Sequence, residues 1–289
     1  MNMEKIINTA EQKERSEQVI KLPIIDIVRH GKSKYKEYFD KEFKFDQSAD
    51  DFSLSPDSLD ITKEGIEELE ETARQIENLI NKENEILLLV TSPSARAQSS
   101  LLVVRKYLEQ QGITFLNPNK TYKTKQLRPL DLKNVEKDKD EFIQKTQEYV
   151  KEVGSLSAPT DEVKEEIAQR MNREFGDLFA ENSFEAVNNR LKRFLRHMIN
   201  IHKSLFDDTK KTIGDKQLRI LCLSHEELPV KFIKEVFGED SKINMQNGQI
   251  LEIKPNESEA DKNVMNGNVT LYPKGKETGT INKDVEIKL

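Results

Sequence analysis

Three short apolar runs, each followed at once by polar residues, constrain the fold of this 289-residue chain more than any other feature of its sequence. The runs are Leu22 to Val28, Ile86 to Val90 and Leu218 to Leu223. Runs of this length, rich in leucine and β-branched side chains, are typical of strands that are buried on both faces of a parallel sheet. The sequence therefore predicts a sheet with these three strands at its centre.

Amphipathic helical patterns separate the three runs. Apolar residues recur at steps of three and four from Ile66 to Ile80, with Thr62 as the expected N-cap, and again from Phe184 to Met198. Two further helices are expected, from Pro93 to about Gln110 and from Leu228 to Phe237. Alternation of strands and helices predicts an α/β fold, a three-layer sandwich whose mostly parallel central sheet is flanked by helices.

Composition divides the chain into three parts. Residues 1–20 are polar and are expected to form an N-terminal extension, whereas residues 21–255 hold the strands and helices of the α/β domain. Within that domain, residues 133–182 are highly charged and poor in apolar side chains, which predicts a helical insertion over one edge of the sheet. Residues 256–289 are expected to form a polar linker, through residue 268, and then a C-terminal β hairpin.

Composition also argues against several classes of protein. The formal net charge of −6 disfavours a nucleic-acid partner, because binding to a phosphate backbone needs a basic surface. No apolar run reaches the roughly 18 residues of a membrane span, and the N-terminus lacks the apolar segment of a signal peptide. The single cysteine, Cys222, fits a cytoplasmic location. Without a Cys/His cluster, we expect no structural zinc site, and we expect no other metal and no cofactor either.

The polar residues that follow the three apolar runs are chemically related. Arg29, His30 and Gly31 follow the first run, Thr91 to Arg96 follow the second, and Ser224 to Glu227 follow the third. Ligands of open α/β sheets bind beyond the carboxyl ends of the strands. If the three strands are neighbours, two arginines and two of the chain's four histidines converge on one pocket.

Such a pocket suits phosphoryl transfer. A phosphoryl group in transit carries its charge on three equatorial oxygens, and the forked guanidinium group of arginine matches those oxygens. A neutral imidazole can attack phosphorus and carry the phosphoryl group covalently. The two arginines would supply the positive charge that a metal ion supplies in other enzymes, so the pocket needs no metal.

The order of these elements resembles the histidine phosphatase superfamily, also called the phosphoglycerate mutase-like family. Five elements between about residues 22 and 255 carry the resemblance: Val28 to Ser33 (VRHGKS), Ile61 to Gly65 (ITKEG), Ser92 to Ala97 (SPSARA), Asn182 to Arg190, and Ser224-His225. The resemblance implies that His30 is the nucleophile and that Arg29 and Arg96 bind phosphate. It also implies that His225 completes the pocket and that Ser33 is a secondary phosphate-binding residue.

The general acid departs from the family pattern. The smaller branch of the family usually has a glutamate in the segment that corresponds to Leu127 to Asp131, and Pro129 occupies the expected position here. Asp131 is the nearest carboxyl group and the first candidate, and Glu136 is another. The larger, phytase-like branch takes its acid from the residue after the second histidine, which is Glu226 in this chain. All three candidates stay open.

The residues and the resemblance together predict a phosphomonoester hydrolase of the histidine acid phosphatase type, with a small-molecule or phosphoprotein phosphate monoester as its substrate. A phosphoglycerate-type mutase is disfavoured. Mutases have a Trp- and Asn-rich motif after the Arg-His-Gly triplet, whereas the residues that follow the triplet here do not match it and the chain has no Trp. A non-catalytic module that binds a phospho-ligand or a protein is the third hypothesis. The substrate is expected to depend on residues 133–182 and on the loop Lys34 to Pro56. For the C-terminal hairpin two roles stay open, addition to the edge of the sheet or formation of a homodimer.

Overall fold

The computed structural model describes residues 21–34, 59–129, 148, 184–204, 211–238, 245–256, 264–274 and 279–289. The N-terminal extension 1–20, almost all of the insertion 133–182 and most of the loop from Lys34 to Pro56 lie outside the described residues. Asp131 and Glu136, two candidates for the general acid, lie outside them too. The expected division of the chain into parts therefore stays a prediction.

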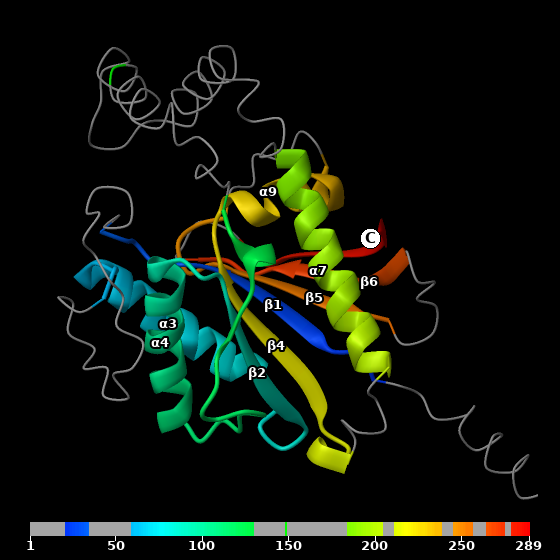
Figure 1. The fold of residues 1–289 in the computed structure, drawn as a ribbon, viewed down its shortest axis with the longest axis horizontal. Helices are drawn as coiled ribbons and strands as arrows, with labels where there is room; N and C mark the ends of the chain where they lie inside the picture. The colour runs from blue at the N-terminus through cyan, green and yellow to red at the C-terminus, as the bar shows by residue number, and fades with distance from the viewer. Residues whose placement is uncertain are drawn as a thin grey trace, which may run out of the picture.

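A mixed sheet of seven strands in the order β3-β2-β4-β1-β5-β6-β7 forms the centre of the molecule (Figure 1). Its strands are β1 (Ile24–Arg29), β2 (Glu85–Thr91), β3 (Tyr122–Lys123), β4 (Gln217–Ser224), β5 (Ile250–Pro255), β6 (Val264–Leu271) and β7 (Ile281–Lys288). The strands from β3 to β1 are parallel, and β5, β6 and β7 continue the sheet in antiparallel pairings. The three apolar runs are the neighbouring strands β2, β4 and β1, as a shared pocket requires.

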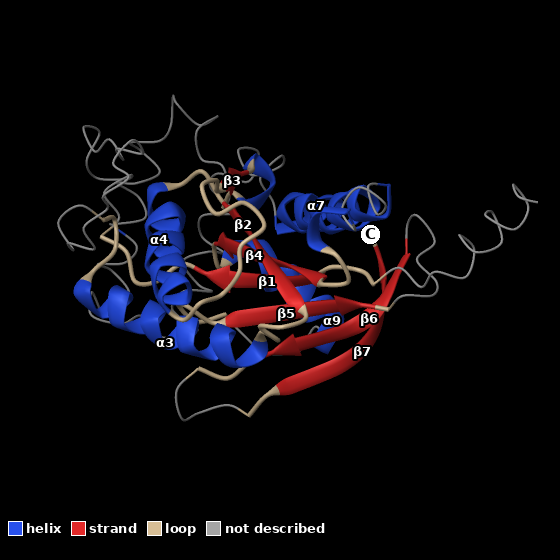
Figure 2. Cartoon of the chain, turned by 90° about the horizontal axis from the view of Figure 1, so that it is seen from below, coloured by secondary structure: helices blue, strands red, loops and turns tan. Residues whose placement is uncertain are grey.

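Helices cover both faces of this sheet (Figure 2). On one face, α3 (Lys63–Leu79) packs against α4 (Ala95–Gln110), and on the other α7 (Phe184–Ser204) packs against α9 (Glu227–Phe237). A short 3-10 helix, η1 (Lys125–Leu127), contacts α7. The predicted α/β fold, with parallel central strands between two helical layers, is confirmed. No helix among the described residues is long and apolar enough to cross a membrane.

Side chains of the central strands alternate between two apolar cores. Ile25 and Ile27 of β1 are fully buried in the core that α7 and α9 close, and Val28 is fully buried in the core beneath α3 and α4. Full burial of such a side chain contributes about 1.5–3 kcal/mol. Because both faces of β1 are buried, the position of His30 directly after this strand is firmly fixed.

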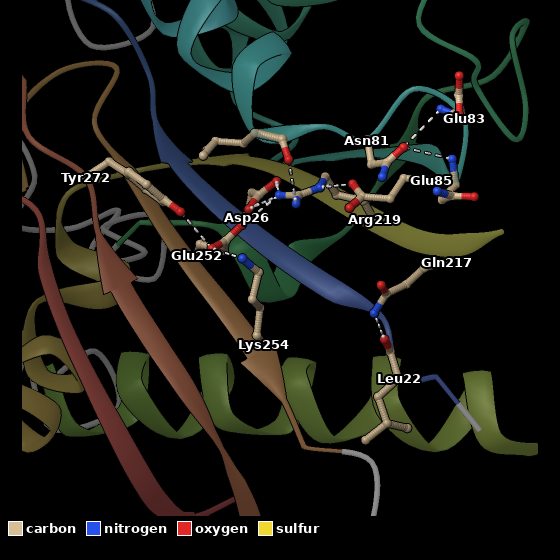
Figure 3. Close-up of polar contacts among 12 residues, drawn as sticks. Leu22, Asp26, Asn81, Glu83, Glu85, Gln217, Arg219, Glu252, Lys254 and Tyr272 are labelled. Atoms are coloured by element: carbon tan, nitrogen blue, oxygen red, sulfur yellow. Dashed lines mark hydrogen bonds and ion pairs between the residues drawn. The ribbon is translucent and has the colours of Figure 1, made fainter. Parts of the chain in front are cut away.

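A buried ionic cluster lies within the core beneath α3 and α4 (Figure 3). Arg219 of β4 donates its Nη1 to Asp26 of β1 at 2.9 Å and to Glu252 of β5 at 2.9 Å, and its Nε to Glu85 of β2 at 2.6 Å. Its Nη2 donates to the carbonyl oxygen of Leu79, the last residue of α3. One guanidinium group therefore joins four adjacent strands and the end of a helix.

The C-terminal strands extend the main sheet. β6 pairs with β5 and β7. It begins at Val264, whereas the sequence was expected to form a polar linker through residue 268. Met265 and Val269 are buried in the core, whereas Asn266 and Asn268 between them are half-buried. The two asparagines hid the period-two pattern that marks a strand with one buried face.

Candidate active site

The candidate active site lies at the carboxyl ends of β1, β2 and β4. His30 directly follows β1, Arg96 lies in the first turn of the helix that follows β2, and His225 directly follows β4. The parallel register pairs Arg29 with Ser224, so the residues that leave these two strands meet. The side chains of His30, Arg96 and His225 are all buried.

Arg96 connects the two histidines. Its Nε–H donates to Nε2 of His30 at 3.0 Å and to Nδ1 of His225 at 3.2 Å. The two imidazole rings lie edge to face, with their centroids 5.2 Å apart. Since a guanidinium group can only donate hydrogen bonds, both ring nitrogens that face Arg96 carry lone pairs. Two lone pairs and a buried cation therefore meet at one point.

His30 is held in the form that a nucleophile requires. Its Nδ1 lies 2.7 Å from the carbonyl oxygen of Gly31, so Nδ1 carries the proton and donates it to this carbonyl. Burial, and then the positive charges of Arg96 and Arg29, lower the pKa of His30 to about 3. The imidazole is therefore neutral near pH 7, and its Nε2 lone pair points toward Arg96.

His225 is fixed from two sides. Its Nδ1 accepts from Arg96, while its Nε2 lies 2.9 Å from Oγ of Ser92 and 3.0 Å from Oγ of Ser94. Burial, followed by the charge of Arg96, lowers the pKa of His225 well below its usual value. The sequence placed both serines in the SPSARA element but gave them no role in the site.

Gly31 allows α3 to pack against the backbone next to His30. A Cβ atom at Gly31 would lie 2.7 Å from the carbonyl oxygen of Gly65 and 2.8 Å from Cδ1 of Leu69. The backbone N–H of Gly31 donates to Oγ of Ser100 at 3.1 Å, which ties the triplet to α4 as well. Glycine is needed at this position because only a residue without a side chain permits so close an approach.

Arg29 lies at the edge of the site and contacts one of the candidate acids. Its Nη1 donates to the carbonyl oxygen of Met245 at 2.6 Å, and its Nη2 forms an ion pair with Glu226 at 2.7 Å. Within the described part of the chain, its buried Nε has no hydrogen-bond partner. The protein thus holds Arg29 through both of its Nη atoms, which fixes the guanidinium group at the edge of the site.

Arg190 of α7 lies near the site, and the sequence did not predict this position. Its Nη2 donates to the carbonyl oxygens of Arg128 and Pro129, at 3.0 and 2.9 Å. Its charge also contributes to the lowered pKa of His225. Arg190 therefore holds the backbone that leads toward Asp131. The only sequence signal was its place in the helix that carries the family resemblance.

Ser33 is buried at the start of the loop that follows the triplet. Its backbone forms an isolated bridge with Ile61, and its Oγ has no hydrogen-bond partner among the described residues. No contact given by the described residues joins Ser33 to His30. Its role in phosphate binding stays a prediction.

The described residues offer no group of three His, Cys, Asp or Glu side chains that could hold a metal ion. Positive charge at the site comes from Arg29 and Arg96, and both histidines are neutral near pH 7. The described site therefore presents guanidinium groups and imidazole lone pairs, which suit an anionic ligand with an electrophilic centre.

Comparisons with known proteins bear on the fold. No protein-family model and no curated protein matches the chain. Similar solved structures include a phosphoglycerate mutase from Bacillus anthracis, with 17% identity, a TM-score of 0.45, and coverage of 81% of this chain and 88% of that one. A phosphoserine phosphatase from Entamoeba histolytica in complex with phosphoserine has 14% identity and a TM-score of 0.36, and covers 80% and 90% of the two chains.

A phytase from Klebsiella sp. ASR1 has 8% identity and a TM-score of 0.36, with coverage of 92% of this chain and 88% of that chain. The three proteins are members of the superfamily that the sequence motifs resemble, and they include both a mutase and phosphatases. Likeness at these identities and TM-scores does not distinguish one activity from another.

Proposed function

We propose that this protein is a phosphomonoester hydrolase that works through a covalent phosphohistidine at His30 and needs no metal ion. The observation that carries the proposal is the arrangement around Arg96, whose Nε–H meets the lone pairs of His30 and His225, with all three side chains buried. A phosphoryl group placed there would have a guanidinium group for its oxygens and a neutral imidazole for its phosphorus.

The proposed reaction has two steps. In the first, Nε2 of His30 attacks phosphorus in line, and the bond between phosphorus and the ester oxygen breaks while a general acid protonates that oxygen. In the second, water attacks the phosphorus atom and gives a proton to the carboxylate that the general acid left behind, the bond between phosphorus and Nε2 breaks, inorganic phosphate leaves, and His30 returns to its neutral form. Arg96 and Arg29 offset the charge on the equatorial oxygens in both steps.

Among the candidate acids, we keep Asp131 ahead of Glu226, because the side chain of Glu226 is already bound by another residue. Glu226 forms an ion pair with Arg29 at 2.7 Å, so its carboxyl group is already engaged by one of the candidate phosphate-binding residues. Arg190 anchors the backbone at Pro129, two residues before Asp131. Glu136 remains an alternative donor from the same part of the chain.

One observation favours a second candidate function, a non-catalytic module that binds a phospho-ligand. Both Nη atoms of Arg29 are already held, one by Glu226 and the other by the carbonyl oxygen of Met245. In addition, Pro129 stands where the family's smaller branch has its acid. Such a module would bind phosphate but turn over no ester. A mutase, in contrast, would require a bisphosphorylated primer for activity.

Turnover of 4-nitrophenyl phosphate by the wild type, His30→Ala and His197→Ala tests the proposal. His197 is an exposed histidine of α7, so its replacement controls for loss of a histidine elsewhere. We expect His30→Ala to lose about a thousandfold or more in kcat/KM and His197→Ala to keep wild-type activity. A rapidly quenched reaction of the wild type with labelled substrate should carry acid-labile, alkali-stable phosphate on His30.

Three results would oppose the proposal. Equal turnover by wild type and His30→Ala would exclude the nucleophile, and loss of activity with a chelator would exclude the metal-free mechanism. Absence of wild-type turnover from acidic to neutral pH, with inorganic phosphate still bound, would favour the binding module.

A further inference from the structure

Ser94 stands at the N-cap of α4 but does not cap it. A serine at this position normally accepts a hydrogen bond from a backbone N–H in the first turn of its helix. Thr62, the N-cap of α3, does so by accepting from Gly65 at 3.1 Å. Ser94 makes no side-chain cap bond, and its Oγ lies instead 3.0 Å from Nε2 of His225.

Ser92 contacts the same ring nitrogen. Its Oγ lies 2.9 Å from Nε2 of His225, and the backbone N–H of Ser94 lies 3.4 Å from that Oγ. The two hydroxyl groups therefore belong to one turn at the end of β2. Both are aimed at a histidine whose side chain is fully buried.

The opposite side of the ring decides where its proton lies. Arg96 donates to Nδ1 of His225 at 3.2 Å, so Nδ1 has a lone pair and the proton is on Nε2. The serine hydroxyl groups are then the acceptors for Nε2–H. His30 has the reverse arrangement, because its Nδ1 donates to Gly31 and its Nε2 faces Arg96.

We propose that Ser94, together with Ser92, is a positioning residue that holds Nε2–H of His225 and so keeps Nδ1 of this ring facing the phosphoryl group. The proposal rests on the proposed function, because it assigns His225 to the transferring group. A second hydroxyl acceptor matters here because the ring is buried and an unsatisfied N–H costs about 1–3 kcal/mol.

Positively charged groups around His225 affect the protonation of its ring. Arg96 of α4, Arg29 at the end of β1 and Arg190 of α7 all oppose a positive charge on the ring in the empty site, as does the neighbouring His30. A phosphoryl dianion offsets these charges and favours a proton on Nδ1, which then donates to a phosphoryl oxygen. Hydroxyl acceptors suit both forms of the ring, because Nε2–H is present in each.

Nitrogen-15 NMR of selectively labelled histidine provides the test, since only four histidines contribute signals. The variants are Ser94→Ala, Ser94→Thr to restore the hydroxyl group, and Thr62→Ala as the matched loss of an N-cap. In the wild type we expect a proton on Nε2 of His225 and on Nδ1 of His30. In Ser94→Ala, the signal of His225 should shift toward a mixture of tautomers while that of His30 stays unchanged.

The same variants should differ in activity and stability. With 4-nitrophenyl phosphate, kcat of Ser94→Ala should fall about tenfold, the effect of one hydrogen bond of about 1.4 kcal/mol, and KM should change much less. Ser94→Thr should recover most of that rate. The thermal midpoint of Ser94→Ala should stay close to wild type, because no cap bond is lost, whereas that of Thr62→Ala should fall with its histidine signals unchanged.

A wild-type tautomer and a wild-type rate in Ser94→Ala would overturn the proposal. A lower thermal midpoint in that variant, with the signal of His225 unchanged, would overturn it as well and leave Ser94 as a helix cap. If the wild type turns over no phosphate ester, the proposed function fails, but the NMR result still decides whether Ser94 controls His225.

Discussion

Two arginines are almost completely buried in the described part of the chain, and their surroundings differ in kind. Arg219 is 1% exposed and bonds to the carboxylates of Asp26, Glu85 and Glu252. Arg96 is 3% exposed and donates its Nε–H to two neutral imidazole rings. Fixed carboxylates compensate the first cation within the sheet, whereas the polar atoms that receive the Nε–H of Arg96 carry no charge.

The contrast separates two uses of arginine within one fold. Arg219 stabilises the sheet, and Arg96 lies in the candidate binding site. A buried cation is costly unless an anion or strong acceptors compensate it. The cluster around Arg219 meets that need permanently and leaves no place for a ligand. Arg96 instead lies at the carboxyl ends of the central strands, where its Nε–H faces two imidazole rings, and a guanidinium group so placed suits the phosphate ligand that we propose.

The largest expected effect comes from Arg96→Ala. Loss of the guanidinium group should lower kcat/KM for 4-nitrophenyl phosphate by about ten-thousandfold, because an arginine on a transferring phosphoryl group contributes a factor of about 10³–10⁵. The free energy of unfolding, measured with urea, should change by only about 1 kcal/mol. A large loss of stability with activity retained would show that Arg96 is structural.

Arg219→Leu should give the opposite pattern. Removal of this cation leaves three carboxylates without their partner, and breaking a buried pair in this way costs about 3–5 kcal/mol of stability. Protein that remains folded should bind inorganic phosphate with wild-type affinity in calorimetry. Weaker phosphate binding by the folded fraction would contradict the separation between the two arginines.

The smallest expected effect is the contribution of Asp26 to the pH dependence of the free energy of unfolding. Burial raises the pKa of Asp26 from 3.8 to about 6, although Arg219 opposes the shift. Because the folded state holds this proton more tightly than the unfolded state, Asp26 favours folding at low pH, and this contribution is lost as the pH rises from about 4 to 6. Over that range the loss should amount to about 2 kcal/mol.

Urea unfolding of wild type and Asp26→Asn across that pH range measures this contribution. The difference in unfolding free energy between the two proteins should shift steadily against the wild type as the pH rises. A difference that is independent of pH would show that Asp26 is ionised throughout, with Arg219 dominating its surroundings.

The parallel centre of the fold could be predicted because its strands are continuous apolar runs. The convergence of His30, Arg96 and His225 could be predicted only on the condition that their strands are neighbours, and the structure meets that condition. The ionic cluster could not be predicted. Asp26 and Arg219 each lie inside an apolar run, and the register that brings them together is not written in either segment.

The contacts of Ser94 and Glu226 could not be predicted from the sequence either. The direction of the Ser94 hydroxyl depends on the turn between β2 and α4, and sequence alone favours helix capping for a serine at that point. Glu226 was a candidate acid, and its ion pair with Arg29 depends on how the ends of β1 and β4 are placed. Asp131 and Glu136 lie outside the described residues, so their role as proton donor stays a prediction.

The Arg219 cluster also sets a limit on how this protein can be shortened in the laboratory. Glu252, which supplies one of the three carboxylates, belongs to β5, and its Oε1 accepts from the hydroxyl of Tyr272 beyond β6 at 2.8 Å. A fragment that stopped before β5 would keep Arg219 and discard part of its countercharge. We therefore expect the strands that carry the candidate site to need the C-terminal strands on the same polypeptide, even though every histidine precedes them.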